Sequence, residues 1–260
     1  MNNIELSSCQ GVPDLSMPTP LYFDGEQAIY WLGIDADVAF RCNAYLLVDK
    51  QEVLLFDPGC RASFETVKQR VAQIVPPETV TGMVLCHHDP DIAASMVDWL
   101  ALQPQMTVYT TFRSNVLLHF YGASDYRFVD VSRQTSLKLP SGTELRFIEA
   151  PFMHFSGAFV TYAALSRFLF SGDIWAAISS DWCLVIDNFQ RHSVKMDMFH
   201  IDYMASNIAA RGFLRKLEPF DIEAILPQHG SVIDRRFVED ALEYLNNLEC
   251  GTDVFYPDMR

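Results

Sequence analysis

The sequence predicts an α/β protein in which two mixed sheets are sandwiched between helices. Three observations point to this fold class. Apolar runs of strand length alternate with helical patterns, several runs follow one another closely enough to form antiparallel hairpins, and both features occur in each half of the chain. The 260 residues, half of them apolar, suffice for one large core. We therefore expect residues 1–260 to form a single domain.

Three β-rich runs open the predicted fold after a polar lead that contains several prolines. These strands are expected at residues 28–33, 43–49 and 52–57. The third strand ends at Asp57-Pro58-Gly59, because Pro and Gly interrupt the ladder of a sheet. Helical spacing follows over residues 63–75, with Ser63 as the N-cap. The predicted order is strand, turn and helix.

The next strand, at residues 80–86, runs directly into the polar segment His87-His88-Asp89-Pro90-Asp91. A helix is expected to follow over residues 92–102, so this polar segment lies at the carboxyl end of a strand. The remaining elements of the first half are strands at residues 107–110, 127–131 and 144–150, with a helix over 113–120 between the first two.

The second half repeats the alternation of strands and helices. Strands are predicted at residues 159–165, 167–173 and 222–228, and helices at residues 203–217 and 237–248. No linker, low-complexity tract or short-period repeat divides this part of the chain from the first half.

Composition argues against several classes of function. A formal net charge of -14 disfavours binding to nucleic acid, which depends on Lys and Arg at the phosphates. The amino terminus lacks the basic start and apolar core of a signal peptide, and no apolar run is long enough to cross a membrane. The six cysteines form no C-x-x-C pair, which suits reduced, structural thiols. We expect a soluble protein of the cytoplasm.

His87, Asp89 and Asp91 place one imidazole and two carboxylates within five residues. Two desolvated carboxylates this close together repel each other, so they are tolerated either in full contact with water or around a bound cation. An exposed acidic turn, in which Asp89 or Asp91 caps the following helix, explains the same segment without any metal. The segment alone leaves both interpretations open.

Three later residues favour the cation. His154, Asp173 and His229 each follow a predicted strand or lie in the loop after it. Taken singly, a histidine beside aromatic residues is more often a hydrogen-bonded core residue than a ligand. Taken together with the earlier segment, they supply three imidazoles and three carboxylates at strand ends.

These motifs carry a family resemblance over nearly the whole chain. The segments NAYLLVD, FDPG, HHDPD, PFMHFSGAFVTY, LFSGD and ILPQHG occur in the order typical of the metallo-β-lactamase superfamily. Within it, the sequence resembles the diiron domain of flavodiiron proteins. The resemblance implies a metallo-β-lactamase-type αββα sandwich of two mixed sheets flanked by helices.

The resemblance also implies a ligand set. His87, Asp89 and His154 bind one metal ion, Asp91 and His229 bind the second, and Asp173 bridges the two. The chain departs from the flavodiiron motif H-x-E-x-D-H in having Asp89 for its Glu and Ile92 for its last His. The second metal is then one imidazole short, and solvent, substrate, His88 or His200 could fill the position. We expect His88 to point away, because neighbouring residues of an extended segment face opposite sides.

Ligand chemistry favours iron. The six residues offer three oxygen and three nitrogen donors, and carboxylate-rich sites without thiolate suit iron or manganese better than zinc. We expect two iron ions, with manganese or zinc less favoured. Aromatic and sulfur-containing residues around the motifs are expected to keep the pocket dry, unless they are ordinary core residues: Phe152, Met153, Phe155, Trp175, Tyr203 and Met204.

The functional expectation follows from this resemblance. The chain has no room for the flavodoxin-like domain of flavodiiron proteins, and it is similar to the oxygen-binding diiron proteins associated with bacterial chemotaxis signalling. The leading hypothesis is therefore a sensor that captures oxygen, peroxide or nitric oxide at a diferrous site and acts on a signalling receptor. Whether the protein forms homo-oligomers stays open.

Three alternatives remain. A metallohydrolase of the superfamily would attack an ester or lactam with a metal-bound hydroxide. A diiron oxidoreductase that reduces oxygen or nitric oxide would need a separate reductase. A binding module could keep a vestigial metal site and dock to a receptor.

Overall fold

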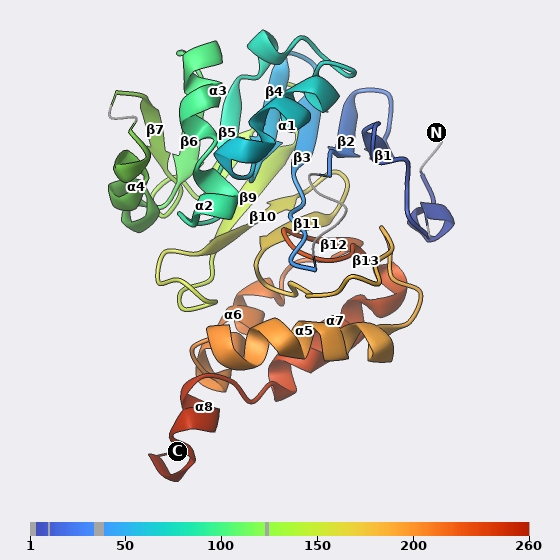
Figure 1. Cartoon of the computed structure of the whole chain (residues 1–260), viewed down its shortest axis with the longest axis vertical. Helices are drawn as coiled ribbons and strands as arrows, with labels where there is room; N and C mark the ends of the chain where they lie inside the picture. The colour runs from blue at the N-terminus through green and yellow to red at the C-terminus, as the bar shows by residue number, and fades with distance from the viewer. Residues whose placement is uncertain (1–3, 10, 34–38, 123–124, 260) are drawn as a thin grey trace.

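The computed structural model describes residues 4–9, 11–33, 39–122 and 125–259, and these form four layers (Figure 1). Two sheets face each other, and helices cover the outer face of each sheet. In Figure 1, helices α1 to α3 lie in the upper part and helices α5 to α7 in the lower part, with the sheets between them. The predicted fold class, two mixed sheets flanked by helices, is confirmed.

The first sheet has seven strands in chain order: β1 (Thr19–Phe23), β2 (Gln27–Trp31), β3 (Tyr45–Asp49), β4 (Glu52–Phe56), β5 (Gly82–Val84), β6 (Thr107–Thr110) and β7 (Arg127–Asp130). Strands β1 to β4 pair antiparallel, and β4 to β7 pair parallel. Six of these strands were predicted. Strand β1 was missed because it contains Pro20 and buries only Leu21, as an edge strand can.

The second sheet has six strands in the order β13 (Ile233–Asp234), β12 (Ala224–Pro227), β11 (Phe168–Gly172), β10 (Phe159–Ala163), β9 (Glu144–Glu149) and β8 (Ser136–Lys138). Only β11 and β12 are parallel. The three longer strands β9 to β11 and strand β12 were predicted. Strands β8 and β13 were not, because three and two residues are too short to show an alternating pattern.

The helices divide between the two sheets. Four helices lie with the first sheet: α1 (Phe64–Val71), α2 (Pro90–Ala93), α3 (Met96–Leu102) and α4 (Phe112–Leu118). Three helices cover the second sheet: α5 (Phe189–Tyr203), α6 (Asn207–Leu217) and α7 (Val238–Asn247). Helix α8 (Thr252–Phe255) lies near the carboxyl terminus (Figure 1). Among the described residues, no helix combines the length and the apolar character that a membrane span requires.

The sequence-based prediction missed helix α5 entirely. The helix expected at 203–217 corresponds to α6, which begins at Asn207 because Ser206 caps it, and it ends at Leu217 as predicted. The buried side of α5 includes His192 and His200 besides its apolar residues, so a polar residue interrupts the apolar stripe that marks a helix in sequence. The helix expected at 92–102 is likewise divided, into α2 and α3.

Aromatic residues pack between the sheets next to the loops that carry the candidate site residues. Phe56, the last residue of β4, stacks on Phe170 of β11 with ring centroids 3.9 Å apart. The residues that follow these strands, Asp57 and Asp173, emerge at the same edge of the sandwich. Because parallel strands end at one edge, β5 and β12 bring their own following loops to this place as well.

Candidate metal centre

The loop after β5 supplies the first ligand-type side chains. His87 is 2% exposed, and its Nδ1 lies 3.1 Å from the Cys86 sulfur, which leaves Nε2 directed at the other polar groups. The Cys86 amide donates a hydrogen bond to the Asp57 carboxylate at 2.9 Å. This bond ties the end of β4 to the loop that carries His87 and Asp89.

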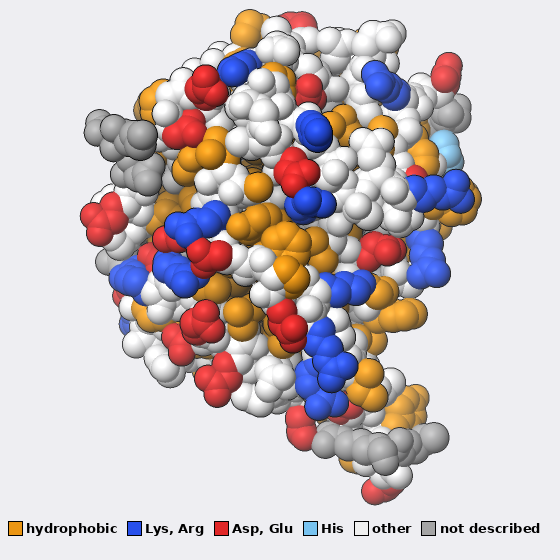
Figure 2. All heavy atoms as spheres, turned by 180° about the vertical axis from the view of Figure 1, so that it is seen from behind, with side chains coloured by type: hydrophobic (Ala, Val, Ile, Leu, Met, Phe, Trp, Pro, Cys, Tyr) orange, Lys and Arg blue, Asp and Glu red, His pale blue; other side chains and the backbone are white. Residues whose placement is uncertain are grey.

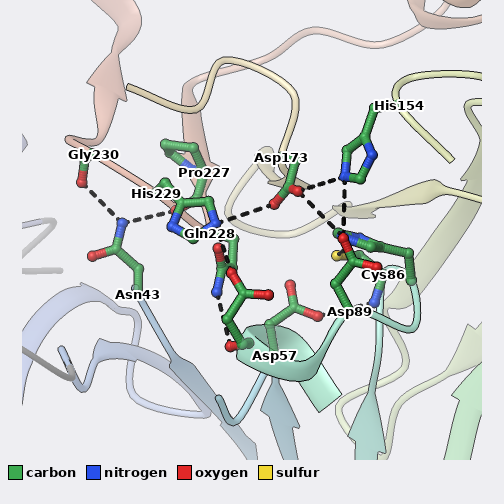
Figure 3. Close-up of polar contacts among 12 residues, drawn as sticks. Asn43, Asp57, Cys86, Asp89, His154, Asp173, Pro227, Gln228, His229 and Gly230 are labelled. Carbon is green, nitrogen blue, oxygen red and sulfur yellow. Dashed lines mark hydrogen bonds and ion pairs between the residues drawn. The ribbon is translucent and has the colours of Figure 1, made fainter. Parts of the chain in front are cut away.

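One cluster consists of His87, Asp89, His154 and Asp173, which offer ligand atoms within 4.8 Å of one another. Figure 3 labels three of these residues, Asp89, His154 and Asp173. The Asp173 Oδ2 atom lies 2.8 Å from His154 Nε2 and 3.3 Å from His87 Nε2. The Asp89 Oδ2 atom lies 3.5 Å from His87 Nε2 and 3.7 Å from His154 Nε2. The structure thus brings together all four residues that the sequence suggested for the first metal.

A second cluster consists of Cys42, Asp91 and His229, again within 4.8 Å of one another. His229 Nε2 lies 3.1 Å from Asp91 Oδ2. Asp91 and His229 were predicted as a pair, whereas Cys42 was expected to be a structural thiol. All six cysteines are free, but the position of Cys42 departs from that expectation. A single cysteine before a predicted strand gave no signal that could have identified it.

Asp173 faces both clusters. Its Oδ2 atom contacts the histidines of the first cluster, while its Oδ1 atom lies 3.6 Å from His229 Nε2 in the second. The carboxylate is 6% exposed and follows strand β11 directly. One oxygen toward each cluster is the arrangement that a bridging carboxylate requires.

Unsatisfied buried atoms show that this donor set fits metal ions. Among the described residues, His87 Nε2, His229 Nε2 and Asp173 Oδ1 are buried and make no hydrogen bond. A buried polar atom without a partner costs about 1–3 kcal/mol. Three such atoms that converge on one place are explained if cations complete their coordination, because histidine nitrogen and carboxylate oxygen are ordinary ligands of iron and zinc.

Electrostatics also favours positive charge at this place. Burial alone would raise the pKa of Asp173, but the charge of His87 and a hydrogen bond from His154 hold that pKa well below its usual value. Burial opposes protonation of His229, yet the Asp91 carboxylate and Cys42 raise its pKa to about 10. The carboxylates therefore stabilise cations here, whether these are protonated imidazoles or metal ions.

Strained backbone accompanies the ligand loops. Asp57, Phe152 and Trp175 have φ values of 46°, 68° and 65°, in the left-handed region that non-glycine residues rarely adopt. Phe152 precedes His154 by two residues, and Trp175 follows Asp173 by two. Such strain persists only where the surrounding structure holds it, and it is concentrated at functional sites.

The remaining histidines lie outside the two clusters. His200 is fully buried, accepts a hydrogen bond from the Trp175 amide at Nε2 and contacts the Met196 carbonyl at Nδ1, each at 2.9 Å. Both ring nitrogens of His200 therefore already have partners, so His200 is not the imidazole that the second metal lacks. His88 lies beside Phe155, with ring centroids 4.3 Å apart, but its Nε2 is 3.4 Å from Asp89 Oδ1, so it does not point fully away from the clusters as expected. Ile92 belongs to α2 and is fully buried in the apolar core that α1 to α3 share with the first sheet.

Aromatic rings line part of the centre. The ring of Phe40 stacks on His229 at 3.6 Å between centroids, and Phe199 and Tyr203 of α5 each contact the His154 ring edge-on. Of the six pocket residues suggested by sequence, Tyr203 contacts His154 and Phe155 contacts His88, whereas Phe152 is exposed. The other three belong to the core beneath the second sheet: Met153, Trp175 and Met204. Phe40 and Phe199 were not foreseen.

Residues 40–230 match the family model described as "ODP family beta lactamase". The chain is 29% identical to two solved structures, "Peroxy diiron species of chemotaxis sensor ODP" and "Apo state of chemotaxis sensor ODP from T. denticola". The TM-scores are 0.81 and 0.80, and each alignment covers 93% of this chain and 98% of the other. A flavodiiron protein from Giardia intestinalis shares the fold, with a TM-score of 0.75 and 21% identity over 84% of this chain.

A curated relative is an uncharacterized protein of Methanocaldococcus jannaschii, 25% identical over 85% of this chain. The chain spans 59% of the length of that relative and 56% of the Giardia flavodiiron chain. The compared region therefore corresponds to one part of these longer proteins.

Proposed function

The chain belongs to the ODP family of β-lactamase-like proteins, and from its two clusters we propose that it is a diiron protein that captures oxygen. The observation that carries this proposal is the position of Asp173, whose two carboxylate oxygens face one cluster each. A carboxylate held in this way can join two metal ions without moving.

The proposed ligands are those that converge in the structure. His87, Asp89 and His154 would hold the first ion, Asp91 and His229 would hold the second, and Asp173 would bridge them. Iron is supported by the related sensor, one structure of which is described as a peroxy diiron species. Bound iron would supply the electron donation that oxygen binding needs, and the surrounding side chains determine access and charge.

The chain's own residues suit capture. The ring of Phe40 packs on His229 and those of Phe199 and Tyr203 pack on His154, so one imidazole of each cluster has apolar neighbours, which would limit proton delivery to a ligand bound beside it. The two imidazoles that would hold the first ion come from separate loops, one tied to Asp57 through the Cys86 amide and the other in contact with Asp173. Oxygen is the proposed ligand, and peroxide and nitric oxide are the alternatives to be compared with it.

We place this activity in signalling, with a receptor protein as the partner, because the related protein is described as a chemotaxis sensor. The surface supports a protein partner over nucleic acid. On the face seen in Figure 2, acidic and basic side chains of the described residues are interspersed with apolar ones, and the formal net charge of the whole sequence is -14. Nucleic-acid binding would need a positively charged face.

The deciding experiment combines metal analysis with an anaerobic optical titration. Protein purified from iron-replete cells should contain about two iron ions per chain, as a two-cluster ligand set requires. Adding oxygen to the reduced protein should produce a long-lived change in the visible spectrum, and His154→Ala should abolish it. A reduced, fully iron-loaded protein whose spectrum did not respond to oxygen would falsify the proposed function.

A further inference from the structure

Cys42 lies where the second metal ion would bind. It precedes strand β3, and its sulfur is within 4.8 Å of ligand atoms of Asp91 and His229. Position 42 is partly buried, so the sulfur is neither packed away in the apolar core nor freely solvated. The resemblance to flavodiiron proteins does not predict a thiol here.

Backbone pairing holds this sulfur in register with His229. Cys42 and His229 form an antiparallel bridge, and the Asn43 amide donates to the Gln228 carbonyl at 2.6 Å. The Asn43 side chain donates to the carbonyls of Pro227 and Gly230, each at 2.9 Å (Figure 3). Directly opposed residues of an antiparallel pair project from the same face. The thiol and the imidazole therefore face the same space.

The His229 ring independently points to a ligand in that space. The side chain is fully buried, and its Nδ1 lies 3.1 Å from the Arg41 carbonyl, to which it can donate. Its Nε2 atom is buried without a hydrogen bond and is directed at Asp91. An imidazole held by a carbonyl at one nitrogen, with the other nitrogen free, is the usual arrangement of a histidine that binds metal.

We infer that Cys42 coordinates the second metal ion as a thiolate and supplies the ligand that Ile92 does not. This inference rests on the proposed function, because it assumes an ion between Asp91 and His229. Each ion then has four protein ligands, since Asp173 serves both. Metal bonds of about 2.0 Å to nitrogen and about 2.3 Å to sulfur fit one ion among atoms this close together.

Charge balance supports the thiolate. Three ligand aspartates carry three negative charges against the four positive charges of two divalent ions, and a thiolate adds the fourth. When the metal binds, the S–H bond of Cys42 breaks, its proton passes to solvent and a metal–sulfur bond forms, with no electron transferred. A thiolate is compatible with iron or zinc and disfavours manganese, which prefers oxygen ligands, so the preference for iron over zinc then rests on the related sensor.

Cobalt(II) provides the test, because its bond to a thiolate gives an intense near-ultraviolet charge-transfer band that bonds to nitrogen and oxygen do not. Metal-free protein would be titrated anaerobically with two equivalents of cobalt. We expect the band in the parent protein and in Cys183→Ser, a control at a partly buried thiol outside both clusters. Cys42→Ser should lose the band and bind the second cobalt at least about 10-fold more weakly.

Cys42→His supplies a further measurement, because it returns an imidazole to the second ion. It should recover the second binding step without the band. If a serine variant did not fold, alkylation of the parent protein would decide, since two bound cobalt ions should protect Cys42 but not Cys183. Retention of the band in Cys42→Ser, or alkylation of Cys42 at an unchanged rate in the loaded protein, overturns the inference.

These outcomes separate the inference from the proposed function. Two tightly bound ions and an optical response to oxygen, without a thiolate band, would leave the proposed function intact and remove Cys42 from the ligand set. A thiolate band in a protein whose iron form does not respond to oxygen would leave Cys42 as a ligand and overturn oxygen capture.

Discussion

At the scale of single residues, Asp173 is the side chain on which both clusters depend. Its two oxygens face different histidines, so its removal would leave the two proposed cations close together without the carboxylate between them. We expect Asp173→Ala to lower the iron content from about two ions per chain to less than about one, and Asp91→Ala to retain about one. Iron analysis of the purified variants is the measurement.

The control for this prediction is Asp187→Ala, which removes an exposed carboxylate that pairs with Arg191 away from both clusters. It should keep both ions. Full iron retention in Asp173→Ala would contradict the bridging role, whatever the behaviour of the Asp91 variant.

His192 makes stability depend on pH, independently of the metal ligands. Burial first, and then the charge of Lys195, lower its pKa to about 4 in the folded protein. Above the unfolded pKa of about 6.5, neither state binds the proton. As the pH falls from 6.5 toward 4, the unfolded chain is protonated and the folded chain is not, so stability is lost in that window.

The expected loss at His192 is at most about 3 kcal/mol, at about 1.36 kcal/mol for each unit of pKa shift. Urea unfolding of the metal-free protein at pH 7 and at about pH 4.5 measures it. His192→Leu should lose less stability between the two pH values than the parent protein, whereas His119→Gln, a change at an exposed residue, should follow the parent. An equal loss of unfolding free energy between the two pH values in His192→Leu and in the parent would show that His192 does not contribute to the pH dependence of stability.

At the scale of elements, helix α5 depends on its amino-terminal cap. The Asn188 side chain accepts a hydrogen bond from the Arg191 amide at 2.9 Å, and the helix carries Phe199 and Tyr203 to the metal centre. Asn188→Ala should lower the free energy of unfolding by about 1 kcal/mol, because it leaves a helix amide unpaired. Chemical denaturation is the measurement.

The neighbouring carboxylate provides the matched comparison for this cap. Asp187 forms an exposed ion pair with Arg191 one turn along the same helix. Exposed pairs contribute little to stability, so Asp187→Ala should change the unfolding free energy by less than Asn188→Ala does. The reverse order would mean that the helix terminus is stabilised by charge and not by the cap.

At the scale of the whole molecule, the arrangement of the two clusters predicts capture without turnover. The reduced iron protein should not consume oxygen continuously when NADH is supplied without a reductase, because two ferrous ions donate about one electron each and a flavin must mediate further supply from NADH. An oxygen electrode measures this.

The iron-loaded protein should also hydrolyse lactams, thioesters and phosphodiesters no faster than a slow background. Efficient hydrolysis that Asp91→Ala abolished would place the chain among the hydrolases of the superfamily instead.

Local sequence determined most of the architecture and the order of the ligand-type residues. Strands β3, β4 and β11 are buried on both faces between layers, so they occur as continuous apolar runs that are visible in the sequence. The polar residues that follow strands stand out against such runs. For this reason the sequence alone could predict one group of candidate metal ligands before any contact between them was known: His87, Asp89, Asp91, His154, Asp173 and His229.

Tertiary structure alone decided which other side chains lie beside that group. Cys42 lies beside His229 because Asn43 forms hydrogen bonds with the segment 227–230, which is far from it in the sequence and belongs to the other sheet. No local sequence pattern predicts such a pairing. The same holds for His200, whose two nitrogens are committed to the Trp175 amide and the Met196 carbonyl. Helical and strand periodicity report which face of an element is buried, whereas a metal centre depends on which buried faces meet.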